Sequence, residues 1–235
     1  MKTLHIKSEE RGQADHGWLK ARFMFSFANY YNPEQMSFGT LRVLNDDIIQ
    51  GGTGFPEHPH ANMEIVTVPL SGSLKHVDNM GNSGVISSGE VQVMSAGTGV
   101  FHSEFNGSTS EEANICQIWV MPGKNGVEPR YDQLQFSMDK NVLQQIVSPD
   151  PNDAGSWIHA DAWFNHGVFD KGQTVDYQLH KDTNGLFLFL IEGIVKVGDH
   201  EINRRDGFGV WDTDQVTFEI EEEARLLLLE VPMLG

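Results

Sequence analysis

Apolar and polar residues alternate along this chain in short runs, and stretches with a helical period are scarce. Runs of aliphatic, β-branched or aromatic residues recur between clusters of glycine, asparagine, aspartate and serine, as at 64–70 and 186–191. Such runs are typical of strands, and the clusters between them are typical of turns. The pattern predicts a mostly β protein. Only residues 139–146 leave a choice between a short helix and a strand, because their periodicity fits both.

Two blocks of predicted strands resemble each other. Each block has a long apolar strand ending before a glycine, a strand after that glycine, a turn, a further strand and a closing apolar strand. The blocks comprise residues 64–70, 73–77, 89–94 and 115–121, and residues 186–191, 194–197, 206–211 and 226–231. This spacing suits an antiparallel barrel or jelly roll, and the tandem suggests duplication.

The fold class that follows is all-β, with two jelly-roll-like antiparallel barrels packed face to face. A turn-rich segment at 122–131 separates the blocks. We therefore expect an N-terminal barrel at residues 1–130 and a C-terminal barrel at residues 131–235, together forming a monomer.

Four candidate metal ligands stand in two pairs. His58 and His60 are two residues apart, and so are His102 and Glu104. Residues i and i+2 of a strand point to the same face, so each pair can direct two ligands to one point. Three imidazoles and a carboxylate suit Fe, Mn, Ni, Cu or Zn and leave coordination positions for water or substrate.

The second block has no matching histidines. Superposing the blocks on Gly72 and Gly193 pairs His58 with Leu179 and His60 with Lys181. Past the turns, allowing six fewer residues in the second block pairs His102 with Thr217 and Glu104 with Glu219. The sequence predicts one metal site, in the N-terminal barrel.

Composition restricts the possible partners. The net charge is −17, and no Lys/Arg cluster offers a nucleic-acid surface. The single cysteine, Cys116, lies in an apolar run and is expected to be a small core residue. The first residues lack the apolar run of a signal peptide, and no stretch approaches membrane-spanning length. We expect a cytoplasmic protein that binds neither nucleic acid nor membrane.

Several motifs together resemble the pirin family of the cupin superfamily, over essentially the whole chain. They are GGTGFPEHPHANMEIVTVPLSG, SAGTGVFHSEFN, QIWVMPG and EPRYDQ. The likeness is strongest to bacterial pirin-like quercetin 2,3-dioxygenases. It implies a bicupin with a single metal in its N-terminal barrel, held by His58, His60, His102 and Glu104.

The same resemblance implies a cofactor and substrates. The metal is expected to be Fe(II), with Ni, Mn, Cu, Co or Zn as alternatives. The substrates are a quercetin-like flavonol and dioxygen. In the general cupin motif the carboxylate ligand is placed where Glu64 stands, whereas the pirin pattern uses Glu104. Glu64 is then expected to hydrogen-bond around the ligands, or to replace Glu104 in some states.

The residues permit a division of roles. Glu104 is the candidate base for the flavonol hydroxyl proton, with Glu64 in reserve. Phe101 and Phe105 are an odd number of residues from His102, so they are expected to point outward into packing. Four histidines away from the ligand pairs are expected to be exposed or capping residues; these are His76, His159, His166 and His200.

Three functions remain compatible with the sequence. The first is a metal-dependent dioxygenase acting on flavonols or similar enolisable aromatics. The second is a non-enzymatic metal- or redox-sensing protein that regulates a partner protein, as eukaryotic pirins are linked to transcriptional regulation. The third is another cupin reaction on an endogenous metabolite. Turnover well above that of free metal separates the first from the second.

Overall fold

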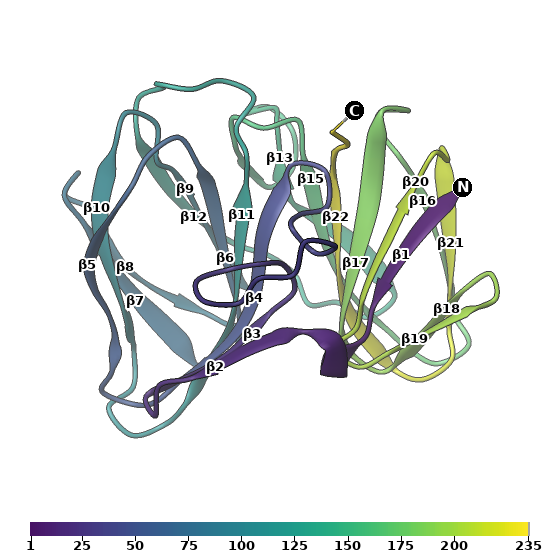
Figure 1. The fold of residues 1–235 in the computed structure, drawn as a ribbon, viewed down its shortest axis with the longest axis horizontal. Coiled ribbons are helices and arrows are strands. Elements are labelled where there is room, and N and C mark those ends of the chain that lie inside the picture. Colours follow the sequence, from purple (N-terminus) through teal and green to yellow (C-terminus); the bar gives the residue numbers. More distant parts are fainter. Residues whose placement is uncertain (235) are drawn as a thin grey trace.

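Four sheets form two β-barrels that lie side by side in the computed structural model, which describes residues 1–234 (Figure 1). The predicted all-β fold of two barrels is confirmed. All pairs of neighbouring strands in the four sheets are antiparallel except one short parallel pair, β13 with β14. The described residues contain no helix long and apolar enough to cross a membrane.

The N-terminal barrel consists of a seven-stranded and a four-stranded sheet. The larger one runs in the order β12 (Arg130–Gln135), β9 (Glu90–Ser95), β6 (Glu64–Ser71), β11 (Ala113–Val120), β4 (Leu41–Ile49), β3 (Leu19–Phe23) and β2 (Gly12–Asp15). The smaller one runs in the order β5 (Gly54–His60), β10 (Val100–Asn106), β7 (Ser73–Asp78) and β8 (Ser83–Ser87).

The C-terminal barrel repeats this plan. Its larger sheet runs in the order β1 (Lys2–Ile6), β20 (Gly207–Trp211), β17 (Asn184–Glu192), β22 (Ala224–Pro232), β15 (Trp163–Phe169), β13 (Val142–Ser148) and β14 (Ser156–Trp157). Its smaller sheet runs in the order β16 (Thr174–Gln178), β21 (Gln215–Ile220), β18 (Ile194–Val197) and β19 (His200–Asn203). A short 3₁₀ helix, η1 (Ser8–Glu10), follows β1.

Two strands cross the predicted boundary between the barrels. β1 pairs with β20 in the C-terminal barrel, and β12 pairs with β9 in the N-terminal barrel. Sheet membership therefore departs from the predicted division into 1–130 and 131–235, because local alternation marks a strand but not its partner. As a division into folding units that boundary stays a prediction. The undecided segment 139–146 contributes to β13, a strand.

The two larger sheets pack face to face, and their facing residues form the main hydrophobic core. On β17, Phe187 and Phe189 lie in this core, whereas Leu188 and Leu190 fill the C-terminal barrel. Both faces of β17 and β22 are thus buried, which explains why their sequences are continuous apolar runs rather than alternations. Cys116 also lies in the core between the sheets and is fully buried, as predicted.

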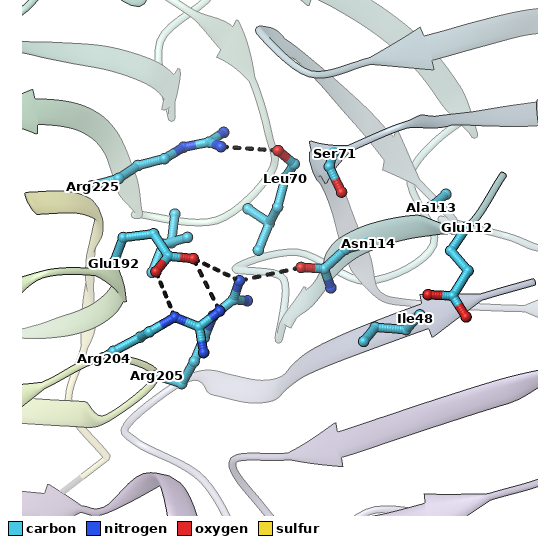
Figure 2. Close-up of a pocket in the computed structure, with 11 residues that line it drawn as sticks. Ile48, Leu70, Ser71, Glu112, Ala113, Asn114, Glu192, Arg204, Arg205 and Arg225 are labelled. Carbon is cyan, nitrogen blue, oxygen red and sulfur yellow. Dashed lines mark hydrogen bonds and ion pairs between the residues drawn. The ribbon is translucent and has the colours of Figure 1, made fainter.

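Arginines on the C-terminal barrel connect the two barrels at the edge of this core. Figure 2 shows the cleft of about 350 Å³ that they line. Arg225 donates a hydrogen bond to the carbonyl oxygen of Leu70 on β6 at 2.9 Å. Arg205 donates to Asp46 Oδ1 at 2.9 Å and to Asn114 Oδ1 at 3.3 Å. These bonds help to fix the position of one barrel against the other.

Truncating a side chain in the interior of the C-terminal barrel is expected to destabilise the protein. Leu228 is fully buried there, so Leu228→Ala should lower the free energy of unfolding by about 2–5 kcal/mol through lost burial and a residual cavity. Leu134→Ala, at a side chain 38% exposed on β12, should cost less than about 0.5 kcal/mol. Chemical denaturation of both variants measures the difference; equal effects would contradict a packed interior.

Candidate metal centre

Pairing of β5 with β10 brings three histidines to one point inside the N-terminal barrel. His102 lies opposite His58, and Val100 lies opposite His60. The ring centroids are 4.4 Å apart for His58 and His102, and 4.9 Å apart for each of the other two pairs. One ring nitrogen from each histidine lies within 4.8 Å of the others. This is a spacing at which one ion can contact all three.

Glu104 follows on β10 and faces the same interior. The register between β10 and β5 shifts between His102 and Glu104, so a bulge separates these two positions. Glu104 is 2% exposed, and its Oε2 accepts a hydrogen bond from Gln117 Nε2 at 3.0 Å. Gln117 in turn accepts a hydrogen bond from Thr67 Oγ1 at 2.9 Å. This chain of bonds fixes one carboxylate oxygen of Glu104, and the other has no hydrogen-bond partner among the described residues.

Several buried polar atoms around this point have no hydrogen-bond partner among the described residues. They include His102 Nε2 and Glu104 Oε1, together with atoms of Asn45, Asp47 and Trp119. Buried polar atoms without a partner are uncommon, since each costs about 1–3 kcal/mol. An imidazole nitrogen and a carboxylate oxygen are both lone-pair donors, so a transition-metal cation would satisfy both. The residues present therefore fit a divalent metal.

Burial also puts two of the imidazoles in the state that binds metal. Together with the smaller effect of the neighbouring His58, it lowers the pKa of His60 to about 4 and that of His102 to about 3. Both rings are neutral at pH 7. Burial raises the pKa of Glu104 to about 7, against the opposing effect of the hydrogen bond from Gln117. A nearby cation would favour the carboxylate form.

The histidines open onto a pocket of about 190 Å³. It is lined by Phe27, Asn45, Asp47, Phe55, His58, His60, Glu104, Gln117 and Trp119. Trp119 packs its ring against His60 at 4.9 Å. Burial raises the pKa of Asp47 well above its usual range, with the charges of Asp46 and Glu104 adding to the effect. The site is thus a pocket that combines three aromatic side chains with four polar ones beside His58 and His60.

Sequence reasoning did not identify the polar residues that the larger sheet contributes. Asn45 and Asp47 of β4 and Gln117 of β11 point into the barrel, while their neighbours Leu44 and Cys116 lie in the core between the sheets. The available signal was a polar residue at every second position of an otherwise apolar strand. Reading it requires knowing which face of the strand is the inner one.

Glu64 lies on the opposite face of its strand from the site. It shares a β6 face with Val66 and Val68, which lie in the core between the sheets, whereas Thr67 faces the pocket. Its Oε2 accepts a hydrogen bond from Ser95 Oγ at 2.7 Å. It is also absent from both groups of candidate metal ligands, whereas Glu104 belongs to the group with His76 and His102. Glu64 is therefore no candidate for replacing Glu104.

The expectation for His76 and His166 was wrong. His76 is fully buried on β7, opposite Glu104 on β10, and its ring centroid is 5.2 Å from that of His102. His166 is also buried and contacts Arg225. Histidines at inward positions of a strand are buried whatever their polarity. Phe101 and Phe105 do point outward, but 49% and 40% of their surfaces are exposed rather than packed.

The C-terminal barrel interior contains apolar residues at comparable positions. Val216 and Phe218 of β21 are buried, while Thr217 pairs with Asp176 and faces solvent. The superposition that placed Thr217 against His102 was therefore wrong by an odd number of residues. The inward positions nevertheless carry no histidine, and Val175 and Tyr177 complete the apolar set on β16.

Family models match both barrels. Residues 5–120 match the Pirin model, and residues 145–231 match the model of the quercetinase C-terminal cupin domain. A pirin-like protein of Caulobacter vibrioides is 41% identical over 225 residues, which cover 94% of this chain and 96% of that protein. The chain belongs to the pirin family. The sequence resemblance is confirmed.

Relatives of this pirin include a protein of Escherichia coli strain K12 named quercetin 2,3-dioxygenase. It is 39% identical over 226 residues, covering 96% of this chain and 97% of the relative. The crystal structure of YhhW from Escherichia coli superposes with a TM-score of 0.95 at 38% identity, covering 100% and 99% of the two chains. A nickel(II) complex of YhhW gives 0.94 at 37% identity, covering 99% and 100%. A divalent metal site in this pirin is thus plausible on both structural and family grounds.

Proposed function

We propose that this pirin is a dioxygenase that cleaves quercetin-like flavonols, with a divalent metal held by His58, His60, His102 and Glu104. The observation that carries the proposal is the convergence of three imidazoles, with Glu104 brought beside one of them, His102, and with His102 Nε2 and Glu104 Oε1 unpartnered among the described residues. The relative named quercetin 2,3-dioxygenase supports the choice of substrate.

Fe(II) is the proposed native metal, and Ni(II) is the first alternative because a nickel complex of a relative exists. Imidazole suits either ion, so the ligand set alone does not choose between them. When bound, such a cation is a Lewis acid that lowers the pKa of an enolic hydroxyl and favours its anion. Dioxygen then reacts with this electron-rich substrate.

Residues of the chain hold the substrate and take its proton. Glu104 is the base for the 3-hydroxyl, because one of its oxygens is anchored by Gln117, the other has no partner among the described residues, and the carboxylate lies beside His102. Phe55 and Trp119 provide aromatic walls. The pocket, about 190 Å³, is smaller than the roughly 300–1,000 Å³ usual for ligand sites. We expect the enol edge of the flavonol to enter this pocket. The rest of the flavonol would then extend past His58 and His60, which are half-exposed.

The proposed reaction is balanced by dioxygen alone. Carbon–oxygen bonds form at C2 and C4 of the flavonol, and the bonds from C3 to both carbons break. The carbon C3 leaves with its own oxygen as carbon monoxide. Both atoms of dioxygen remain in the ring-opened ester, so the flavonol is oxidised and dioxygen is reduced without another reductant.

Dioxygen uptake with quercetin tests this function. Protein stripped of metal and reloaded with Fe(II), or with Ni(II) in parallel, should consume one dioxygen and release one carbon monoxide per quercetin. The rate per metal should exceed that of the free ion by at least about 100-fold, as expected for positioned general base catalysis. No uptake from fully metallated protein would overturn the dioxygenase and favour the metal- or redox-sensing alternative.

A further inference from the structure

A fourth histidine, His76, lies directly beside the proposed ligands. Its Nδ1 is 3.4 Å from Nδ1 of His102, at the long end of hydrogen-bond distances. His76 is fully buried, and its ring stacks on Tyr131 with centroids 4.7 Å apart. Neither the family motifs nor the ligand pattern gives this residue a role.

Asp78, two residues along β7, determines which nitrogen of His76 carries hydrogen. Its Oδ1 accepts backbone hydrogen bonds from Met80 and Asn82, both at 2.9 Å. Its Oδ2 accepts from Asn82 Nδ2 at 2.9 Å and lies 3.1 Å from His76 Nε2. Because both oxygens of Asp78 already accept hydrogen bonds, Asp78 is a carboxylate and can only accept from the ring of His76. His76 therefore donates from Nε2, and its Nδ1 has a free lone pair.

That lone pair faces two groups that can donate. One is Gln92 Nε2 at 3.4 Å, and the other is His102 Nδ1 at the same distance. If His102 carries its hydrogen on Nδ1, its Nε2 becomes the lone-pair atom. His102 Nε2 is buried and has no hydrogen-bond partner among the described residues. With hydrogen on His76 Nε2 and on His102 Nδ1, His76 donates to Asp78 and accepts from His102. The lone pair of His102 is then on Nε2.

We infer that Asp78 and His76 are positioning residues that select the tautomer of His102 and thereby present its Nε2 to the metal. The inference rests on the proposed metal site. Hydrogen bonds of this kind to the non-ligating nitrogen are known to orient metal-bound imidazoles, and losing them typically costs 10–100-fold in metal affinity. We call the hydrogen bonds from His102 to His76 and from His76 to Asp78 the relay. It connects β10 to β7 and ends at Asp78, which also accepts the backbone hydrogen bonds of the following turn.

His76 has a competing role, because it also forms a potential ligand group with His102 and Glu104. The two roles exclude each other at Nδ1. A lone pair that binds metal cannot accept the hydrogen bond from His102, and Nε2 is already committed to Asp78. The test must therefore distinguish positioning from ligation.

Two substitutions of His76 separate these roles. His76→Phe keeps the volume and the stacking on Tyr131 but removes the acceptor. His76→Asn keeps an acceptor oxygen near the place of Nδ1. Long-range proton–nitrogen NMR of the histidine-labelled full chain reads the tautomer of His102 directly, both in metal-free and in Zn(II)-loaded protein, with His102→Ala for assignment.

The relay predicts the Nδ1–H tautomer of His102 in the wild type and in His76→Asn, and a shift towards Nε2–H in metal-free His76→Phe. Zn(II) affinity should fall about 10–100-fold in His76→Phe and recover most of this loss in His76→Asn. An unchanged tautomer in His76→Phe would overturn the relay. So would a wild-type His76 Nδ1 resonance that shows direct coordination by Zn(II).

The tautomer measurement separates this inference from the proposed function. If the wild type bound no metal, the proposed function would fail, while the comparison of metal-free proteins would still decide whether His76 sets the tautomer. If the wild type bound metal and cleaved quercetin but His102 kept its tautomer in His76→Phe, only the relay would fail.

Discussion

Replacing His102 with alanine is expected to abolish both metal binding and quercetin cleavage. His102 is 1% exposed and provides one of three converging imidazoles. Losing a residue that merely supports a ligand costs 10–100-fold in metal affinity, so losing the ligand itself should cost at least about 100-fold. Metal content after chelator treatment and reloading, together with dioxygen uptake, measures the effect.

A matched histidine gives the control. His16 is exposed in the loop between β2 and β3, away from the barrel interior, so His16→Ala should keep one metal per chain and full turnover. Circular dichroism of both variants in the presence of chelator checks that the fold survives. Stoichiometric metal and normal turnover in folded His102→Ala would contradict the proposed ligand set.

The sequence was sufficient to place the two ligands of each pair on one strand face, because that is a local property of strands. An i, i+2 pair shares a face in any regular strand, and the pairing of β5 with β10 places His58 opposite His102. The bend before β10 is likewise local, since it depends on a glycine. Gly97 has a φ of 47° and lies so close to Val127 that no side chain fits there.

Long-range pairing was the part that the sequence did not reveal. His76 becomes a neighbour of His102 only because β7 pairs with β10, and nothing local in the sequence indicates that contact. The strand β1 joins the C-terminal barrel from the far end of the chain for the same reason. The superposition of the two blocks also placed Thr217 wrongly against His102. Shifting a strand by one residue exchanges its two faces, so a small error in counting residues is enough.

The barrels differ in what fills them, and this difference accounts for a single site. One continuous apolar cluster fills the C-terminal barrel. In the N-terminal barrel two smaller apolar clusters are found, around Ile115 and around Ile65. Polar residues such as Thr67, Gln92 and Gln117 are buried there as well and form hydrogen bonds around the histidines and Glu104. A metal centre needs such a polar interior, whereas the second barrel is free to be an ordinary hydrophobic core.

Replacing Glu104 with glutamine is expected to separate metal binding from catalysis. The amide keeps the size of the side chain and an oxygen that can accept from Gln117 or face the metal, but it cannot take a proton at neutral pH. If Glu104 is the base, the rate per bound metal should fall at least about 100-fold, within the range known for general bases. Loss of one anionic ligand should weaken metal binding by a smaller factor.

The measurement is the turnover of quercetin per bound metal at saturating Fe(II) or Ni(II), so that weaker metal binding does not enter the rate. Glu57→Gln is the matched control, since Glu57 is exposed on β5 next to His58 and carries the same charge. It should leave both metal affinity and turnover near those of the wild type. Wild-type turnover per metal in Glu104→Gln would exclude Glu104 as the base and direct attention to Asp47, the other carboxyl group of the pocket.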